Sequence, residues 1–273
     1  MMRQIYSNAQ SVSVWLGESD KTADSDIAMQ YLATRKPFDP ERPDFRKLWN
    51  VRQTKGILAL CTRNYWRRIW IVQEIMHAKR ATMYCGSSTV EWKKLEQLVT
   101  DLQMISKRGR EKHTPLVSAV LASPGFAVAN AKTAWDGNLE PLTTLLQISR
   151  EHEATDIRDK VYALLGLARD GADLTVDYNM STDDLFLEVL DHACTSWPSG
   201  DDIARRKKRL ISFGKSVAEM LKASFTEFDI KSHVCAGPRE RSTKQNHDLK
   251  NPDLENPLPE DPVLRKWEII DRQ

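Results

Sequence analysis

The sequence lacks the features that would place it in a membrane or in a secretory pathway. No apolar run approaches the ~20 residues that a helix needs to span a bilayer, and polar residues interrupt the first positions, where a signal peptide would carry its apolar core. Charged residues make up 29% of the 273 residues, which excludes a membrane protein as a class. The net charge of +2 is too small to indicate a nucleic-acid partner. The basic run 205–209 is either a polyanion patch or the solvated start of a helix.

Cysteine is scarce, and none of the motifs that usually hold a cofactor is present. The cysteines lie far apart, outside any C-x-x-C motif or zinc spacing, at Cys61, Cys85, Cys194 and Cys235. We expect reduced thiols that pack as small apolar side chains inside a cell. The sequence has no G-x-G-x-x-G loop, no P-loop and no serine nucleophile elbow. We therefore predict an intracellular, cytoplasmic protein with no metal and no permanently bound cofactor.

Composition changes toward the C-terminus. After about Glu240 apolar residues become sparse and prolines become frequent. Such a segment buries too little apolar surface to offset the entropy lost on ordering. We predict a disordered or loosely docked tail over 238–273, in which Trp267, Ile269 and Ile270 are the residues that would dock as one short element.

The first two hundred residues alternate between strand and helix patterns. Short β-type runs predict strands over 11–16 and 81–85, with 174–176 as a further candidate. Because a long helical crossover joins the first two strands, we expect them to be parallel neighbours. Helical spacing predicts helices over 24–35, 45–62, 65–79, 92–106, 141–151, 157–168, 182–196 and 203–226. The predicted fold is therefore α/β and helix-dominated, with a small parallel sheet surrounded by many helices and a connector over 107–140.

One carboxylate stands inside the most apolar helical pattern. The segment Tyr65–Ile75 is apolar on nearly all sides, which predicts a buried helix with Glu74 beside Trp70. Burial would raise the pKa of Glu74, and Arg67, two turns earlier, would lower that pKa. Glu74 is either at the rim of a pocket with aromatic walls, suited to a flat ring, or in a buried Glu–Arg pair that orients the helix.

A second polar group marks the start of a later helix. Thr155 or Asp156 is placed to cap it, and Asp159 falls in its first turn, where the helix dipole favours a carboxylate. Arg158 and Lys160 flank this N-terminus, a usual place for an anion. The alternative is a well-capped structural helix whose arginine ties two elements together.

Five blocks in this order resemble the fungal heterokaryon-incompatibility (HET) domain family. They are Ile5–Ala9 with Val12–Glu18, the R-R-x-W-x-V-Q-E block Arg67–Glu74, Cys85-Gly86 with Trp92, the block Asp156–Ala168, and Asp177-Tyr178 with Ser181 and Phe186. Ile157 replaces the proline usual in the fourth block, and the motifs with which the family begins are absent. The chain therefore resembles a truncated or mis-started member with an incomplete, TIR-like sheet. The resemblance assigns 1–110 to the C-terminal part of a HET domain and 111–237 to the helical extension typical of HET proteins.

The resemblance also implies a function. HET proteins act in non-self recognition and trigger death of the cell formed when incompatible fungi fuse, which implies a protein partner or self-association. HET domains are distantly similar to TIR domains, some of which cleave NAD with a glutamate that follows an aromatic residue on a helix. By this resemblance NAD becomes a candidate substrate, with Glu74 catalytic and Trp70, Arg67 and Arg158 as binding residues.

Three hypotheses follow. The first is a cell-death signalling domain, which ranks first because the family blocks support it whether or not a pocket is complete. The second is a TIR-like NAD-cleaving enzyme, for which we expect this chain to be inactive because the phosphate-facing loop of the first strand is missing. The third is a non-functional gene fragment. An in-frame family motif upstream of Met1 in the genome would favour the first two hypotheses, and a stop codon there would favour the third.

Overall fold

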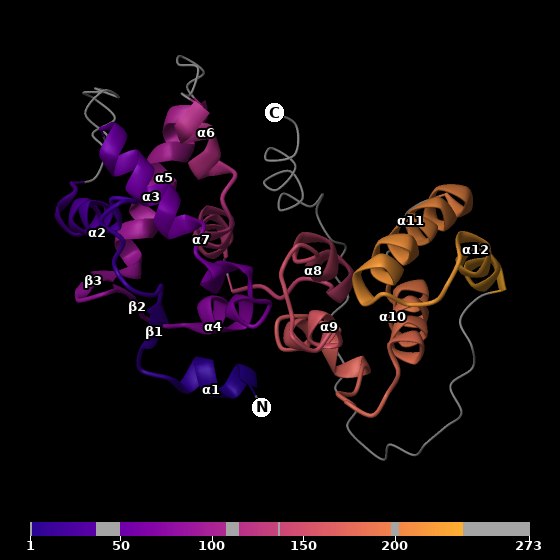
Figure 1. The fold of residues 1–273 in the computed structure, drawn as a ribbon. Coiled ribbons are helices and arrows are strands. Elements are labelled where there is room, and N and C mark those ends of the chain that lie inside the picture. The colour runs from indigo at the N-terminus through magenta and orange to yellow at the C-terminus, as the bar shows by residue number, and fades with distance from the viewer. Residues whose placement is uncertain (1, 37–49, 108–114, 136, 198–201, 237–273) are drawn as a thin grey trace. The chain divides into compact units, whose positions relative to one another are not determined.

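The protein is built mostly of helices around a small sheet (Figure 1). A computed structural model describes residues 2–36, 50–107, 115–135, 137–197 and 202–236. The chain divides into two compact units, 1–182 and 183–273. The predicted boundary after residue 110 stays a prediction, and the predicted tail 238–273 lies outside the described residues.

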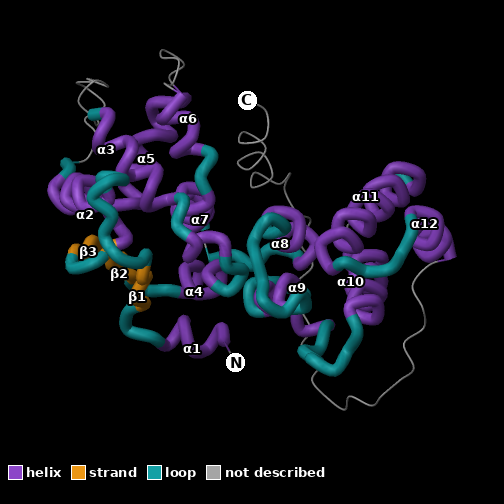
Figure 2. Tube along the Cα trace, viewed as in Figure 1, coloured by secondary structure: helices purple, strands orange, loops and turns teal. Residues whose placement is uncertain are grey.

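The first unit carries the sheet and most of the helices. Its elements are, in order, α1 (Met2–Asn8), β1 (Val12–Trp15), α2 (Ser25–Thr34), α3 (Val51–Cys61), η2 (Asn64–Arg67), α4 (Ile71–His77), β2 (Ala81–Cys85), β3 (Ser88–Glu91), α5 (Trp92–Lys107), α6 (Pro115–Leu121), α7 (Pro124–Ala134), α8 (Leu142–Ile148), α9 (Asp159–Leu165) and η3 (Gly171–Asp173). Figure 2 shows the three strands gathered in one place among these helices. The predicted helix-dominated α/β fold with a small sheet is confirmed.

The sheet has the strand order β1-β2-β3. β1 and β2 are parallel, with Val12 opposite Ala81, so the predicted parallel pairing is confirmed. β3 returns antiparallel to β2 through a two-residue loop, in which Gly86 adopts a φ of 54°. A glycine with positive φ at the first loop position is typical of tight hairpins. The sheet is therefore mixed, and not purely parallel as predicted.

Two predictions about irregular segments are wrong. The strand candidate 174–176 is irregular backbone: Leu174 is buried, but Val176 is 51% exposed and has no strand partner in the described part of the chain. The predicted connector 107–140 contains the helices α6 and α7, which pack on α3 and α5. Each of these helices begins with a proline, a residue that suits the first helical turn because its nitrogen needs no hydrogen-bond acceptor.

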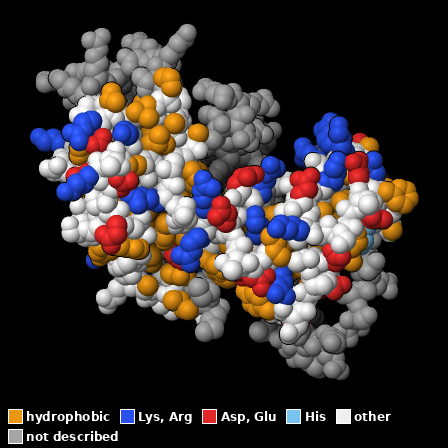
Figure 3. Space-filling model, in the orientation of Figure 1, with side chains coloured by type: hydrophobic (Ala, Val, Ile, Leu, Met, Phe, Trp, Pro, Cys, Tyr) orange, Lys and Arg blue, Asp and Glu red, His pale blue; other side chains and the backbone are white. Residues whose placement is uncertain are grey.

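The second unit consists of α10 (Thr182–Ser196), α11 (Ile203–Leu221) and α12 (Glu227–Ala236). α10 has the predicted bounds, whereas α11 ends earlier than predicted because Lys222 turns into the left-handed region with a φ of 53°. The basic run 205–209 occupies the first turns of α11, and Figure 3 shows blue side chains gathered over this helix. Arg206 donates to the Cys194 carbonyl oxygen at 2.7 Å. Within the described residues, no helix is both long and apolar enough to cross a membrane.

Candidate functional site

The segment that precedes the candidate glutamate is not a continuous helix, so the prediction of a helix over 65–79 is wrong. Between η2 and α4 the backbone is extended at Arg68. This stretch forms a parallel bridge with Glu153: the Ile69 amide donates to the Glu153 carbonyl oxygen at 2.9 Å, and the Glu153 amide donates to the Arg67 carbonyl oxygen at 2.5 Å. Backbone hydrogen bonds to a distant segment thus replace the helical bonds that the local pattern predicts.

Glu74 lies half-buried on α4, with tyrosines as its neighbours. The Tyr65 hydroxyl donates a hydrogen bond to Glu74 Oε2 at 3.1 Å. Burial raises the pKa of Tyr65, and the adjacent charge of Glu74 raises it further. The pKa of Tyr6 is raised in the same way, first by burial and then by the charge of Glu74, while Arg68 opposes this shift. Both phenols therefore stay protonated and are donors toward the carboxylate.

Arg67, the arginine expected near Glu74, has a different partner. Its Nη1 lies 3.3 Å from Glu153 Oε1, and the two side chains are 51% and 65% exposed. An exposed pair of this kind contributes about 0–1 kcal/mol to stability. The structure therefore gives Glu74 a phenolic donor and places the Arg67 guanidinium on the surface.

Trp70 and a carboxylate from the later block are in direct contact. The Trp70 indole N–H donates to Asp159 Oδ2 at 3.0 Å, and the Tyr178 hydroxyl donates to Asp159 Oδ1 at 2.7 Å. Burial, followed by the hydrogen bond and charge of Asp159, raises the pKa of Tyr178 to about 12. Asp159 thus joins the start of α4 to the segment that follows η3.

The Arg158 guanidinium is engaged on several sides. It forms two bonds with Asp156, from Nη2 at 2.7 Å and from Nε at 2.9 Å. Nη1 donates to the carbonyl oxygens of Tyr178 and Met180, and the guanidinium lies over the Tyr178 ring, 5.5 Å from its centroid. These contacts fit an arginine that ties two elements together, whereas its predicted role in anion binding stays a prediction.

Gln73 forms a buried polar contact between α4 and α9. The side chain is 2% exposed, and its Nε2 donates to the Ala163 carbonyl oxygen at 2.6 Å. In a continuous helix the Leu167 amide would donate to the Ala163 carbonyl oxygen. Here it donates to the Leu164 carbonyl oxygen instead, which leaves the Ala163 carbonyl oxygen to Gln73. Gly166 makes the close approach feasible, because a Cβ there would lie 2.9 Å from Gln73 Nε2.

Two buried polar atoms lie one helical turn apart on α4. Gln73 Oε1 and His77 Nε2 have no hydrogen-bond partner within the described part of the chain. Burial lowers the pKa of His77, and a hydrogen bond with the Gly166 backbone opposes this shift. The net lowering favours a neutral imidazole, so this side of α4 is polar but carries no charge from His77 near pH 7.

The comparison with protein families falls on the same region. Residues 1–74 match the family model for the heterokaryon incompatibility protein (HET). We call them the HET segment; it covers 74 of the 273 residues and ends at Glu74. No curated protein and no solved structure matches the chain significantly.

The HET segment ends on the helix that holds three of the contacts described above. Trp70 and Gln73 belong to the HET segment, whereas their partners Asp159 and Ala163 come from outside it. Glu74 and its partner Tyr65 both lie inside the segment. The contacts of Gln73, Asp159 and Tyr65 were not predicted. All three residues lie in or beside the sequence blocks that resemble the family. That position is the feature of the sequence that could have indicated them.

Other kinds of site are not centred on these residues. A groove with a volume of about 700 Å³ lies in the second unit, and its lining includes none of Glu74, Trp70, Arg67 and Arg158. The residues that the structure describes contain no group of three or more potential metal ligands. The chemistry available around α4 is therefore that of one half-buried carboxylate with phenol donors, beside an indole that is already hydrogen-bonded.

Proposed function

We propose that the protein acts in non-self recognition and cell-death signalling in a fungus, inside the cell, through a protein partner or self-association. The match of residues 1–74 to the HET family carries this proposal. The contacts of the HET segment give it further support, because Gln73 and Trp70 bond to α9 and so serve to hold the fold. A signalling domain needs such a rigid surface, whereas it needs no complete pocket.

Inducible expression in a filamentous fungus tests this proposal. We expect the intact chain to reduce the fraction of viable cells. Gln73→Glu places a carboxylate oxygen against the Ala163 carbonyl and is expected to remove the effect. Gln147→Glu is the matched control, because Gln147 is exposed on α8 and the same change there leaves the core intact. Full viability with the intact chain at equal protein levels would contradict the proposal and favour a non-functional fragment.

Glu74 supports a second candidate function, which is NAD cleavage of the TIR-like kind. Its carboxylate is half-buried, lies four residues after Trp70 and accepts a hydrogen bond from Tyr65. A carboxylate in this position can accept hydrogen bonds from ribose hydroxyls and stabilise the oxocarbenium-like centre that forms as the bond from nicotinamide to ribose breaks. Water then adds to the ribose carbon, loses a proton and leaves ADP-ribose beside nicotinamide.

Glu74→Gln separates the two functions. The amide keeps an acceptor for the Tyr65 hydroxyl, so we expect a stability loss of about 1 kcal/mol or less. Nicotinamide release and thermal melting are measured on the intact chain, on Glu74→Gln and on Glu153→Gln, an exposed control. We expect cell death without nicotinamide release, unaffected by Glu74→Gln. Release that is lost only in Glu74→Gln, with an unchanged melting curve, would establish the second function, and release that survives in this variant would end the catalytic role of Glu74.

A further inference from the structure

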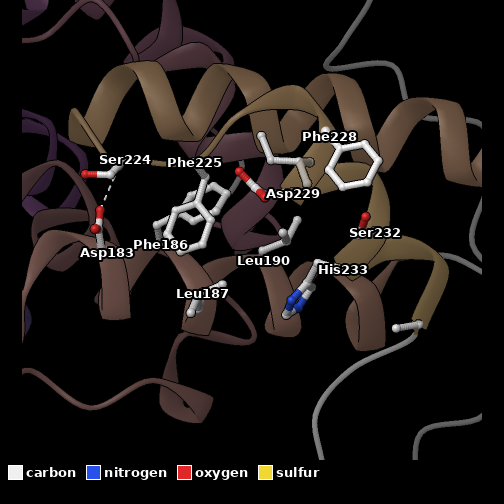
Figure 4. A pocket seen from close by; sticks show the side chains of 12 residues that line it. Asp183, Phe186, Leu187, Leu190, Ser224, Phe225, Phe228, Asp229, Ser232 and His233 are labelled. Carbon is white, nitrogen blue, oxygen red and sulfur yellow. Dashed lines mark hydrogen bonds between the residues drawn. The ribbon is translucent and has the colours of Figure 1, made fainter.

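A groove in the second unit is lined mainly by apolar side chains (Figure 4). The rings of Phe186 and Phe225 are in contact within it, with centroids 4.8 Å apart and planes tilted by 33°. Leu187 is half-buried, and Phe228, on α12, is 75% exposed. Figure 3 shows apolar atoms at the surface over α12. An aromatic ring exposed to this extent beside an apolar groove is typical of a surface that binds another segment.

The polar residues of the groove give it a negative rim. Asp183 and Asp229 are among its lining residues, and no lysine or arginine is. Asp183 accepts a hydrogen bond from the Ser224 amide at 2.8 Å (Figure 4), and a hydrogen bond from Thr226 lowers the pKa of Asp229. Both carboxylates are thus held in place by hydrogen bonds. An occupant with an apolar face and a basic border would fit this surface.

The sequence that follows α12 contains one segment that could present an apolar face and place a lysine beside it. Over 263–270, five of eight residues are apolar, namely Val263, Leu264, Trp267, Ile269 and Ile270. Asp261 and Pro262 are a typical N-cap and first-turn pair for a helix. On a helix, Val263, Trp267 and Ile270 fall on one face at spacings of four and three residues, with Lys266 on one border of that face and Asp271 on the other.

We propose that segment 262–271 binds as an amphipathic helix in the groove between α10 and α12 of the same chain. The groove includes Ala236, the last residue of α12, so the tether to the segment starts at the groove itself. As a random coil, the tether 237–262 has a root-mean-square reach of roughly 28 Å. Short tethers give effective concentrations in the millimolar range, which favours this segment over a second copy of the chain.

Hydrogen–deuterium exchange on the full chain tests the proposal. We expect the amides of 263–270 to exchange at least tenfold more slowly in the intact chain than in Trp267→Ala, and the groove-lining amides of α12 to lose protection in this variant. Trp267→Ala alters no residue of the groove, so it reports on docking without disturbing the folded core. Leu187→Glu and Phe228→Glu are expected to expose the segment. Ile203→Glu is the matched control, because Ile203 is 73% exposed on α11 and does not line the groove.

The possible outcomes are distinct. Protection of 263–270 that is independent of protein concentration and is lost in Phe228→Glu, but not in Ile203→Glu, supports docking within the chain. Equal exchange in the intact chain and Trp267→Ala overturns the proposal. Protection that survives both groove variants overturns it as well, and protection that falls on dilution assigns the groove to a second copy.

Discussion

Gln73→Glu is expected to make the stability of the protein depend on pH through one buried position. Gln73 is 2% exposed, its Nε2 donates to the Ala163 carbonyl oxygen, and its Oε1 has no partner within the described residues. Glutamate at this position brings a carboxylate oxygen against that carbonyl. Burial without a donor disfavours the charged form, so the pKa of the introduced carboxyl rises above its unfolded value of about 4.3.

The direction and size of the effect follow from this shift. Between the unfolded and the raised folded pKa, the folded state binds more protons than the unfolded state, so the free energy of unfolding falls as pH rises through this window. Below about pH 4 both states are protonated, and the carboxyl O–H can donate to Ala163. A rise of about two pKa units costs about 2.7 kcal/mol once pH exceeds the folded pKa, which lowers the melting midpoint by roughly 5–10 °C.

Thermal melting by circular dichroism at pH 5 and pH 8 measures this difference, with Gln147→Glu as the control. Arg3 of α1 comes close to Gly166, and its charge acts on His77, so it is one cation placed to compensate the introduced charge. Adding Arg3→Gln to Gln73→Glu is therefore expected to deepen the loss at pH 8. Equal melting of the intact chain and both Gln73 variants at the two pH values would refute the buried contact between α4 and α9.

Two further predictions concern the thiols and the C-terminal tail. A thiol-reactive probe is expected to label Cys235 first in the folded protein, because Cys235 is exposed and burial raises the pKa of Cys61 to about 12. Intact mass spectrometry counts the adducts. Labelling of Cys61, Cys85 or Cys194 at the rate of Cys235 would contradict the burial of these three thiols. Deletion of 240–273 is expected to shift the melting midpoint by only a few degrees, on a scale of about 2–4 °C per kcal/mol. Failure to recover any folded protein would instead make this tail part of the core.

The parts of the fold that depend on local patterns could be predicted from the sequence. The alternation of buried and exposed residues in Val12–Trp15 marks β1, and the long crossover to Ala81–Cys85 requires a parallel pair. The bounds of α10 follow from its uninterrupted helical spacing. β3 was missed although Gly86 and Ser87 form a local hairpin signal, because the polar residues after them also resemble the start of a helix.

The candidate site was harder to predict because its contacts join distant residues. The helix around Arg68 is interrupted by backbone bonds to Glu153, and no residue near Arg68 indicates them. The role predicted for Trp70 stays a prediction, and its hydrogen-bond partner Asp159 lies 89 positions later in the sequence. Spacing along one helix predicts neighbours only within that helix. Because the helix is interrupted at Arg68, Arg67 pairs with Glu153, and Glu74 accepts a hydrogen bond from Tyr65.

The contacts of α4 also determine when the HET segment can finish folding during synthesis on the ribosome. β1 pairs with β2, which follows the HET segment, and the bonds of Trp70 and Gln73 reach across 89 and 90 positions. At ~5–20 residues per second, synthesis of that interval takes roughly 5–20 s. β2 is made early in this interval, because it ends at Cys85, but until α9 is made Gln73 lacks the acceptor that it has in the folded protein. A polypeptide ended at Glu74 would lack both β2 and the acceptor of Gln73, so the stretch that matches the family model is not a unit that folds alone.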